Sequence, residues 1–220
     1  IYTDYTLFTA NQKILKEVNK VFNFLEVSYK LKKYKHLIVS PHYSANILSK
    51  LIDKEISNHK KGLLSGISLK INNITNYPLV NKLYEASQAG VKVKMIVRGV
   101  CCLVPGVKGL SENIKVISIV DKFLEHPRVY IFENAGERKI YLSSADWMTR
   151  NIENRVEVAT PIYDPNLKQQ IIDVFDITWN DNVKARRING YTQNQFIRNN
   201  KSPVRSQLDI YEYYRNNDNL

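Results

Sequence analysis

The hydrophobic positions from residue 37 onwards alternate between short apolar runs and a helical spacing. The runs Leu37–Ser40, Leu64–Ile71 and Val91–Val97 predict strands. The intervening segments Ser44–His59 and Pro78–Gln88 repeat apolar residues every three or four positions, which predicts helices. Two successive strand–helix units of this length predict parallel strands joined by right-handed crossovers, which is the arrangement of an α/β protein.

The pattern changes after Arg98 and Gly99, where proline and glycine residues interrupt the helical spacing. Four more apolar runs predict strands at Ile114–Val120, Val129–Glu133, Lys139–Ser143 and Val156–Ile162. The polar, glycine-containing segment between the second and third of these runs predicts a hairpin. A helix with an apolar face is then predicted from Pro165 to Asn180.

The N-terminal segment reads as a strand followed by a helix. Residues 1–10 alternate weakly, and residues 11–25 carry apolar side chains at helical spacing. We expect this strand to have no partner within the chain. We therefore interpret residues 1–35 as the C-terminal remnant of a preceding domain and residues 36–190 as the main domain.

The C-terminal segment is rich in Asn, Gln, Arg and Tyr beyond Arg186. Such a composition offers few apolar residues for a core, so we expect residues 191–220 to form an exposed or loosely docked basic tail. The one regular element predicted within it is a short helix at Ser206–Tyr214.

Charge narrows the class of partner. The chain has 220 residues and a formal net charge of +11, with 32 Lys and Arg against 21 Asp and Glu. Long-range steering by this charge favours a polyanion, and nucleic acid, anionic lipid and inorganic phosphate polymers all qualify.

The cysteines and the N-terminus indicate the compartment. The two cysteines are the neighbours Cys101 and Cys102, which are poorly placed for a structural disulfide, and no Cys/His cluster predicts a zinc site. We expect a reducing cytoplasm, with membrane association left open. The chain starts without Met and has no signal pattern, so we take Ile1 as a fragment boundary.

Polar residues that follow the predicted parallel strands are candidates for a site, because ligands of such sheets gather beyond the carboxyl ends of the strands. Lys70 and Asn72 end one strand, and Arg98 ends the most apolar one. The planar charge of Arg98 suits phosphate oxygens, and Gly99 lets the backbone approach a ligand closely.

A second group of candidates lies at the start of the predicted hairpin. His126 and Arg128 are two residues apart on a strand, so their side chains point the same way. An acid/base group beside a fixed guanidinium is an arrangement that phosphoryl chemistry can use.

The spacing around these residues resembles a known signature. His126-x-Arg128-x4-Glu133, followed by Ser143-Ser144-Ala145-Asp146, is similar to the phospholipase D-type pattern His-x-Lys-x4-Asp with its later Gly-Ser-x-Asn turn. This sequence departs from the pattern by having Arg128 for Lys, Glu133 for Asp and Ser143 for Gly.

Longer stretches carry a more specific resemblance, to the C-terminal region of the bacterial polyphosphate kinase family. It covers nearly the whole chain and is carried by Tyr2–Asp4, Val97–Pro105, Ile117–His126, Tyr130–Asn134, Leu142–Asn151, Arg155–Pro161, Val183–Arg186 and Arg205–Gln207. The resemblance implies a phospholipase D-like mixed sheet flanked by helices.

The resemblance also implies roles for individual residues. It implies that Tyr2 contacts the nucleotide base and that Arg98 and His126 approach the phosphates. The family's phosphorylated histidine and its magnesium site lie upstream of this chain. ATP is therefore expected as substrate, and the ligands of Mg²⁺ are expected outside the chain.

The function expected from the resemblance is reversible transfer of the terminal phosphate of ATP to polyphosphate through a phosphohistidine. The expected catalytic residues are His126, Arg98 and Arg128, and the expected ATP- and phosphate-binding residues are Tyr2, Arg98, His126, Lys70, Asn72 and Arg155. Expected partners are polyphosphate, ATP or ADP, the missing N-terminal domains and further copies of the full-length enzyme. Nucleic acid is not expected, and the isolated fragment is expected to be inactive.

Two alternatives of other classes remain open from the residues alone. A phospholipase D-type phosphodiesterase or nuclease would need two complete motifs, and the other candidate, His59-Lys60-Lys61, lacks the later Asp and falls at a helix end. A noncatalytic polyanion-binding module would rest on the basic tail and on the basic linker that precedes residue 36.

Overall fold

A mixed sheet of eight strands forms the centre of the molecule. The computed structural model describes residues 2–27, 32–190 and 194–217. The order of the strands is β10-β5-β4-β3-β7-β8-β9-β2. Their bounds are β2 Ile38–Val39, β3 Ile67–Ile71, β4 Val93–Val97, β5 Ile114–Ile119, β7 Arg128–Phe132, β8 Lys139–Ser143, β9 Val158–Ile162 and β10 Ala185–Ile188. Strands β3, β4 and β5 are parallel and the other neighbouring pairs are antiparallel, so the predicted α/β mixed sheet is confirmed.

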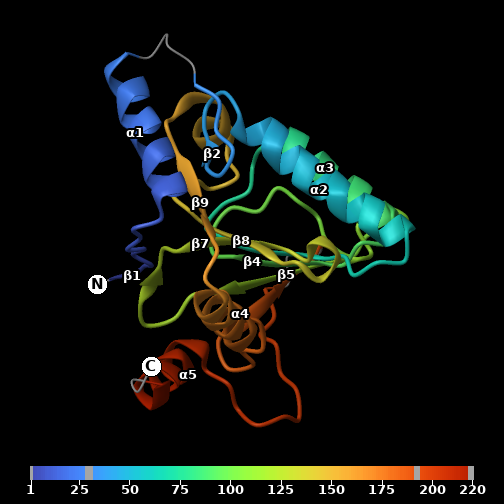
Figure 1. The fold of residues 1–220 in the computed structure, drawn as a ribbon. Helices are drawn as coiled ribbons and strands as arrows, with labels where there is room; N and C mark the ends of the chain where they lie inside the picture. Colours follow the sequence, from blue (N-terminus) through green and yellow to red (C-terminus); the bar gives the residue numbers. More distant parts are fainter. Residues whose placement is uncertain (1, 28–31, 191–193, 218–220) are drawn as a thin grey trace.

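Helices cover both faces of this sheet (Figure 1). Helices α2 (Ser44–Lys60) and α3 (Tyr77–Gln88) lie on one face, and α4 (Pro165–Trp179) lies on the other. Helix α1 (Gln12–Glu26) stands beside β9 and β2, and α5 (Ser206–Asn217) packs near α4. Two short helical turns are η1 at Asn134–Gly136 and η2 at Arg150–Asn154. Among the described residues, no helix is long and apolar enough to cross a bilayer.

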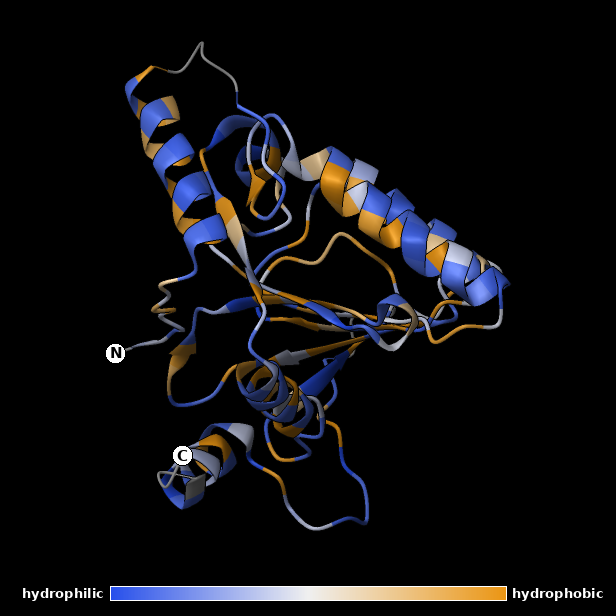
Figure 2. Cartoon of the chain, viewed as in Figure 1, coloured by the Kyte–Doolittle hydropathy of each residue, from blue (hydrophilic) through white to orange (hydrophobic). Residues whose placement is uncertain are grey.

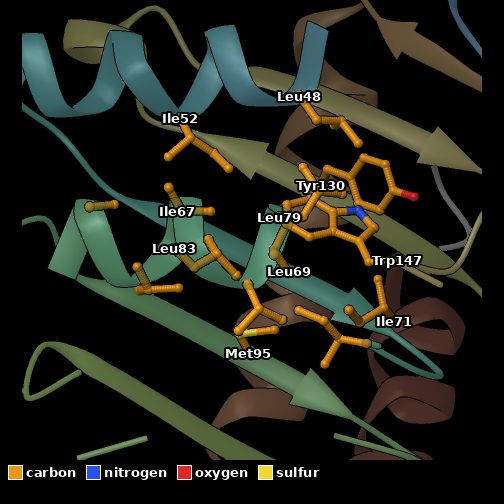
Figure 3. Packing of buried hydrophobic residues seen from close by; sticks show 14 of the residues in the cluster. Leu48, Ile52, Ile67, Leu69, Ile71, Leu79, Leu83, Met95, Tyr130 and Trp147 are labelled. Atoms are coloured by element: carbon orange, nitrogen blue, oxygen red, sulfur yellow. The ribbon is translucent and has the colours of Figure 1, made fainter. Parts of the chain in front are cut away.

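Alternation along the central strands builds two cores. In β3, Ile67, Leu69 and Ile71 face α2 and α3, where they join a buried cluster with Trp147 and Tyr130 (Figure 3). The rings of Trp147 and Tyr130 meet edge to face, with centroids 5.7 Å apart. The alternate side chains of β4, β5 and β7 pack toward α4. Figure 2 shows hydrophobic residues concentrated along the central strands, as expected for a sheet buried on both faces.

The predicted parallel arrangement holds for β3 and β4 but is wrong for β2. Strand β2 is the outermost strand of the sheet and pairs antiparallel with β9. Strands β7, β8 and β9 lie between it and β3. Val39 of β2 and the preceding Leu37 are buried there against Ile14 and Val21 of α1. The hairpin of β7 and β8 is confirmed, with Tyr130 paired to Tyr141.

The N-terminal strand has a partner within the chain, which corrects the expectation that it has none. Strand β1 (Tyr2–Thr3) pairs in parallel with β6 (Leu124–Glu125), a two-residue strand between β5 and β7. A strand of two residues, such as β6, has no periodicity to detect, so the sequence pattern did not indicate this partner.

The expectation of an exposed or loosely docked tail beyond Arg186 is wrong for β10 (Ala185–Ile188) and for the start of α5, whereas residues 194–203 are exposed apart from the half-buried Ile197. Strand β10 is hydrogen-bonded to β5. Ser206, at the start of α5, is fully buried, and its backbone N–H donates to Oδ2 of the buried Asp181. The predicted helix is confirmed as α5, and it is docked because two aspartates of the main domain bind its first residues.

Candidate functional site

The candidate residues meet at the edge of the sheet that is formed by the ends of the central strands. Strands β3 and β4 end there at Ile71 and Val97, and the antiparallel β7 begins there at Arg128. The loops that follow β3 and β4 therefore lie beside the segment that carries His126. This is the edge at which ligands of parallel sheets gather.

His126 is held by the N-terminal Tyr-Thr-Asp segment. Its Nδ1 lies 2.6 Å from Oδ2 of Asp4, and its backbone N–H donates to the carbonyl of Thr3 at 2.9 Å. The ring of Tyr2 meets the His126 ring edge to face, with centroids 5.6 Å apart. Because Nδ1 donates to the carboxylate, Nε2 is left as the nitrogen that can exchange a proton with a ligand. The side chain is 42% exposed, so a ligand can reach it.

Arg128 lies against His126, as the two-residue spacing predicts. Its NH1 nitrogen is 3.1 Å from Nε2 and 3.2 Å from Nδ1 of His126, and it donates to the His126 carbonyl at 3.1 Å. A nitrogen at nearly equal distances from both ring nitrogens lies over the ring face. The remaining guanidinium nitrogens, Nε and NH2, donate to Asp146 at 3.1 and 3.3 Å. Arg128 is therefore fixed by protein groups on two sides.

Asp146 connects this guanidinium to the loop after β3. Its carboxylate accepts the backbone N–H of Asn72 at 2.8 Å and the side-chain amide of Asn73 at 3.1 Å. Burial by itself would raise the pKa of Asp146. The hydrogen bonds and charge of Arg128, with the bonds from Asn73 and Asn72, outweigh burial and hold this pKa below its usual value.

Arg98 joins the same network through Asn72. Its Nε donates to Oδ1 of Asn72 at 2.9 Å, and Nδ2 of Asn72 contacts the carbonyl of His126 at 3.4 Å. A Cβ on Gly99 would lie 2.6 Å from Oδ1 of Asn73 and 3.1 Å from the carbonyl of Asn72. Gly99 is thus required by the packing of the two loops on each other.

Lys70 lies on the opposite face of β3 from Ile71 and is buried. Its ammonium group forms an ion pair with the carboxylate of Glu125, the residue that precedes His126. Its positive charge is therefore offset within the protein. The predicted role of Lys70 in phosphate binding stays a prediction.

A cavity of about 440 Å³ opens beside His126. Its lining residues are Asp4, Tyr5, Leu7, His126, Arg128, Leu142, Ser143, Ser144, Asn151, Arg155, Glu157 and Thr160. Arg155 is exposed at this cavity. Glu157 accepts hydrogen bonds from Ser144 Oγ and from the side-chain amide of Asn151. The cavity thus combines cationic groups with a fixed carboxylate.

Sequence reasoning did not single out Asp4, Asp146 or Glu157 as site residues. Asp4 and Asp146 stand within the motifs that carry the resemblance, and those motifs are the available signal. Spacing could not find them, since Asp4 and His126 are 122 positions apart.

The described residues were also considered as ligands for a metal ion. No group of three or more His, Cys, Asp or Glu side chains among them could hold one. The residues present therefore do not fit a magnesium site by themselves.

The comparison with known protein families matches residues 37–207 to the polyphosphate kinase C-terminal domain 2. The chain belongs to this family. It is 54% identical over 216 residues to a polyphosphate kinase of Klebsiella pneumoniae, covering 98% of this chain and 32% of that protein. It is 52% identical to that of Escherichia coli K12, over 98% of this chain and 31% of that protein. The chain thus spans about a third of the length of the curated relatives it matches.

The fold agrees with this family. The crystal structure of polyphosphate kinase from Porphyromonas gingivalis superposes with a TM-score of 0.92 at 39% identity, covering 96% of this chain and 33% of that one. Nuc from Salmonella typhimurium, a phospholipase D family member, superposes with a TM-score of 0.52 at 16% identity over 70% of this chain and 97% of that one, which shows a shared fold. The predicted membership and the phospholipase D-like fold are both confirmed.

Proposed function

We propose that this chain is the C-terminal part of an ATP:polyphosphate phosphotransferase, in which it binds nucleotide and polyphosphate and supplies a second histidine. The observation that carries the proposal is the network at the sheet edge. His126 and Arg98 are joined there through Asn72, and Arg128 lies against His126. His126 and Arg128 also line an open cavity. The membership of the polyphosphate kinase family supplies the reaction.

In the proposed reaction the γ-phosphoryl group of ATP passes to a histidine nitrogen upstream of this chain, and ADP leaves. A terminal phosphate oxygen of polyphosphate then attacks the phosphorus, the P–N bond breaks, and the polymer is one phosphate longer. The reverse sequence makes ATP. His126 exchanges a proton at Nε2 while the phosphohistidine forms and is discharged, and Asp4 and Arg128 keep its ring in place.

Cationic side chains offset the negative charge of the transferred group. Phosphoryl transfer asks a protein mainly to align the reactants and to stabilise charge on the equatorial oxygens. Arg98 and Arg155 suit this task because one is half-buried beside Asn72 and the other is exposed at the cavity. The net charge of +11 attracts the polymer, so its binding should weaken steeply with salt.

The remaining parts of the proposal concern the nucleotide base, Mg²⁺ and the full-length enzyme. Tyr2 lies beside His126 and is 64% exposed, which leaves its ring open to a nucleotide base. The proposal routes no step through Mg²⁺, because the described residues offer it no ligand set. Assembly of the full-length enzyme into oligomers and its location in the cytoplasm stay predictions.

The test uses the full-length enzyme that carries this chain. His126→Ala should lower synthesis of acid-insoluble polymer from ATP by about 100-fold or more, the usual range for loss of an acid/base group. His59→Ala is the matched control, since His59 lies at the end of α2 and bonds Ser65 rather than the network. Unchanged turnover of His126→Ala would contradict the proposal. Hydrolysis of phosphodiesters without polymer synthesis would favour the phospholipase D-type alternative.

A further inference from the structure

The segment Arg205-Ser206-Gln207 carries part of the family resemblance, yet it lies outside the network that the proposed function uses. It forms the start of α5 and is tied to the main domain. Arg205 donates through Nε and NH2 to both oxygens of Asp121, at 2.8 and 2.7 Å. Asp181 accepts the backbone N–H of Ser206 with one oxygen and three backbone N–H groups of residues 183–185 with the other. A bidentate arginine and a buried aspartate therefore fix the beginning of this helix.

Gln207 binds the segment that leads to His126. Its Nε2 donates to the carbonyl of Phe123 at 2.9 Å, and its Oε1 accepts the Phe123 N–H at 2.9 Å. The side-chain amide of Gln207 thus binds the backbone of Phe123, just before β6, in the way that the backbone of a neighbouring strand would. Nε2 also donates to Oε1 of Glu125 at 3.0 Å, while the other oxygen of Glu125 pairs with Lys70. The carboxylate just before His126 is therefore held from two sides.

The same helix reaches the segment that carries Asp4. Tyr214 of α5 interacts with Tyr5, the neighbour of Asp4. Burial, followed by this interaction with Tyr214, raises the pKa of Tyr5. Helix α5 thus contacts β6 through Glu125 and the segment just after β1 through Tyr5. The pairing of β1 with β6 consists of two residues on each side.

We infer that the start of α5, with Gln207 as its central residue, is a positioning element for the Asp4–His126 pair. The inference rests on the proposed function of His126. A two-residue sheet has little stability of its own, so its geometry depends on what binds it. A displacement of about 1 Å in a catalytic group can lower turnover by about 100-fold, so a distant helix can control the rate through its hold on residues 123–125.

The test replaces Gln207 by Met in the full-length enzyme, which keeps the volume of the side chain and removes its three hydrogen bonds. Turnover should fall by about tenfold or more, because His126 is misplaced. Amide hydrogen exchange of residues 121–127 should become faster, and the melting temperature should stay close to that of the unaltered enzyme. Tyr211→Ala is the control on the same helix, since this side chain is 65% exposed, and it should change none of these values.

The outcomes distinguish a failure of the positioning role of Gln207 from a failure of the function proposed for His126. Unchanged hydrogen exchange at residues 121–127 in Gln207→Met overturns the positioning role, and so does faster exchange with unchanged turnover. If Gln207→Met folds poorly, Arg205→Lys gives the same readings, because lysine keeps the charge but loses the two-pronged bond to Asp121. Failure of the proposed function would appear instead as polymer synthesis that survives His126→Ala with Gln207 intact.

Discussion

Asp146 shows what a single residue contributes to the candidate site. Its two oxygens bind Arg128, the backbone of Asn72 and the side chain of Asn73, so the start of β7 and the loop after β3 both depend on one carboxylate. Arg98 and His126 are connected to it through Asn72. The charge of Asp146 is therefore expected to contribute to stability, and the guanidinium of Arg98 to contribute to turnover.

Asp146→Asn should lower the free energy of unfolding of this chain by about 3 kcal/mol at pH 7, because it leaves the half-buried Arg128 without its ion pair. The folded-state pKa of Asp146 is lowered, so the carboxylate stabilises the fold fully above its unfolded pKa of about 3.9. This contribution is lost as the pH falls through the lower folded-state pKa. Urea denaturation at pH 7, 5 and 3 should show the difference between the two proteins shrinking only at the lowest pH. A difference independent of pH would contradict the assignment.

Arg98→Lys in the full-length enzyme should lower polymer synthesis by about 100-fold, the usual effect of losing one donor to the transition state. Lysine keeps the charge but loses the planar fork and the Nε bond to Asn72. Steady-state rates and a melting curve measure the two effects, and the melting temperature should change little. Turnover within about threefold of the unaltered enzyme would make Arg98 a surface residue only.

The ends of helices show how local sequence sets the elements. Helix α2 is followed by Gly62 with φ +71°, and α3 is followed by Gly90 with φ +98°. Both glycines adopt the left-handed backbone conformation that ends many helices. They differ in their surroundings, since a Cβ on Gly62 would meet no atom within 4 Å, whereas one on Gly90 would lie 2.4 Å from Nε2 of His59.

Gly62→Ala should lower the free energy of unfolding by about 1 kcal/mol, the cost of a left-handed non-glycine residue. Gly90→Ala should lower it by roughly 2 kcal/mol or more, because His59 must also move and give up its bond to Ser65. Urea denaturation of the two variants side by side measures the difference. Equal losses would mean that the His59 ring moves aside without consequence.

The whole chain combines a docked C-terminal helix, a positive charge and a site open to ligands on one sheet edge. It spans about a third of the length of its curated relatives. In the proposed function, the covalent histidine lies upstream of this chain, and this chain contributes binding, positioning and proton exchange.

This chain by itself should not become labelled when it is incubated with ATP that carries a radioactive γ-phosphate, because the proposed nucleophile is missing. The full-length enzyme should be labelled under the same conditions and serves as the positive control. Gel autoradiography after an alkaline wash, which preserves phosphohistidine, distinguishes the two. Label on the isolated chain would place the nucleophile among its own residues.

The sequence by itself determined the elements whose pattern is local. Helices α1 to α4 and strands β3, β4, β5, β7, β8 and β9 lie within a few residues of the predicted ranges, because periodic burial and glycine or proline boundaries act over neighbouring residues. His126 and Arg128 also lie side by side, as their two-residue spacing predicts, although His126 lies in the link between β6 and β7 and not on a strand.

Only the tertiary structure decided the contacts between distant segments. The pairing of β1 with β6, the bond of Asp4 to His126 over 122 positions and the bond of Gln207 to Phe123 over 84 positions leave no periodic trace in the sequence. Lys70 is a free cation in a sequence pattern and becomes an ion-paired, buried one when Glu125 is brought beside it. Such contacts depend on which loops meet at the sheet edge, and that meeting is set by the packing of the whole domain rather than by neighbouring residues.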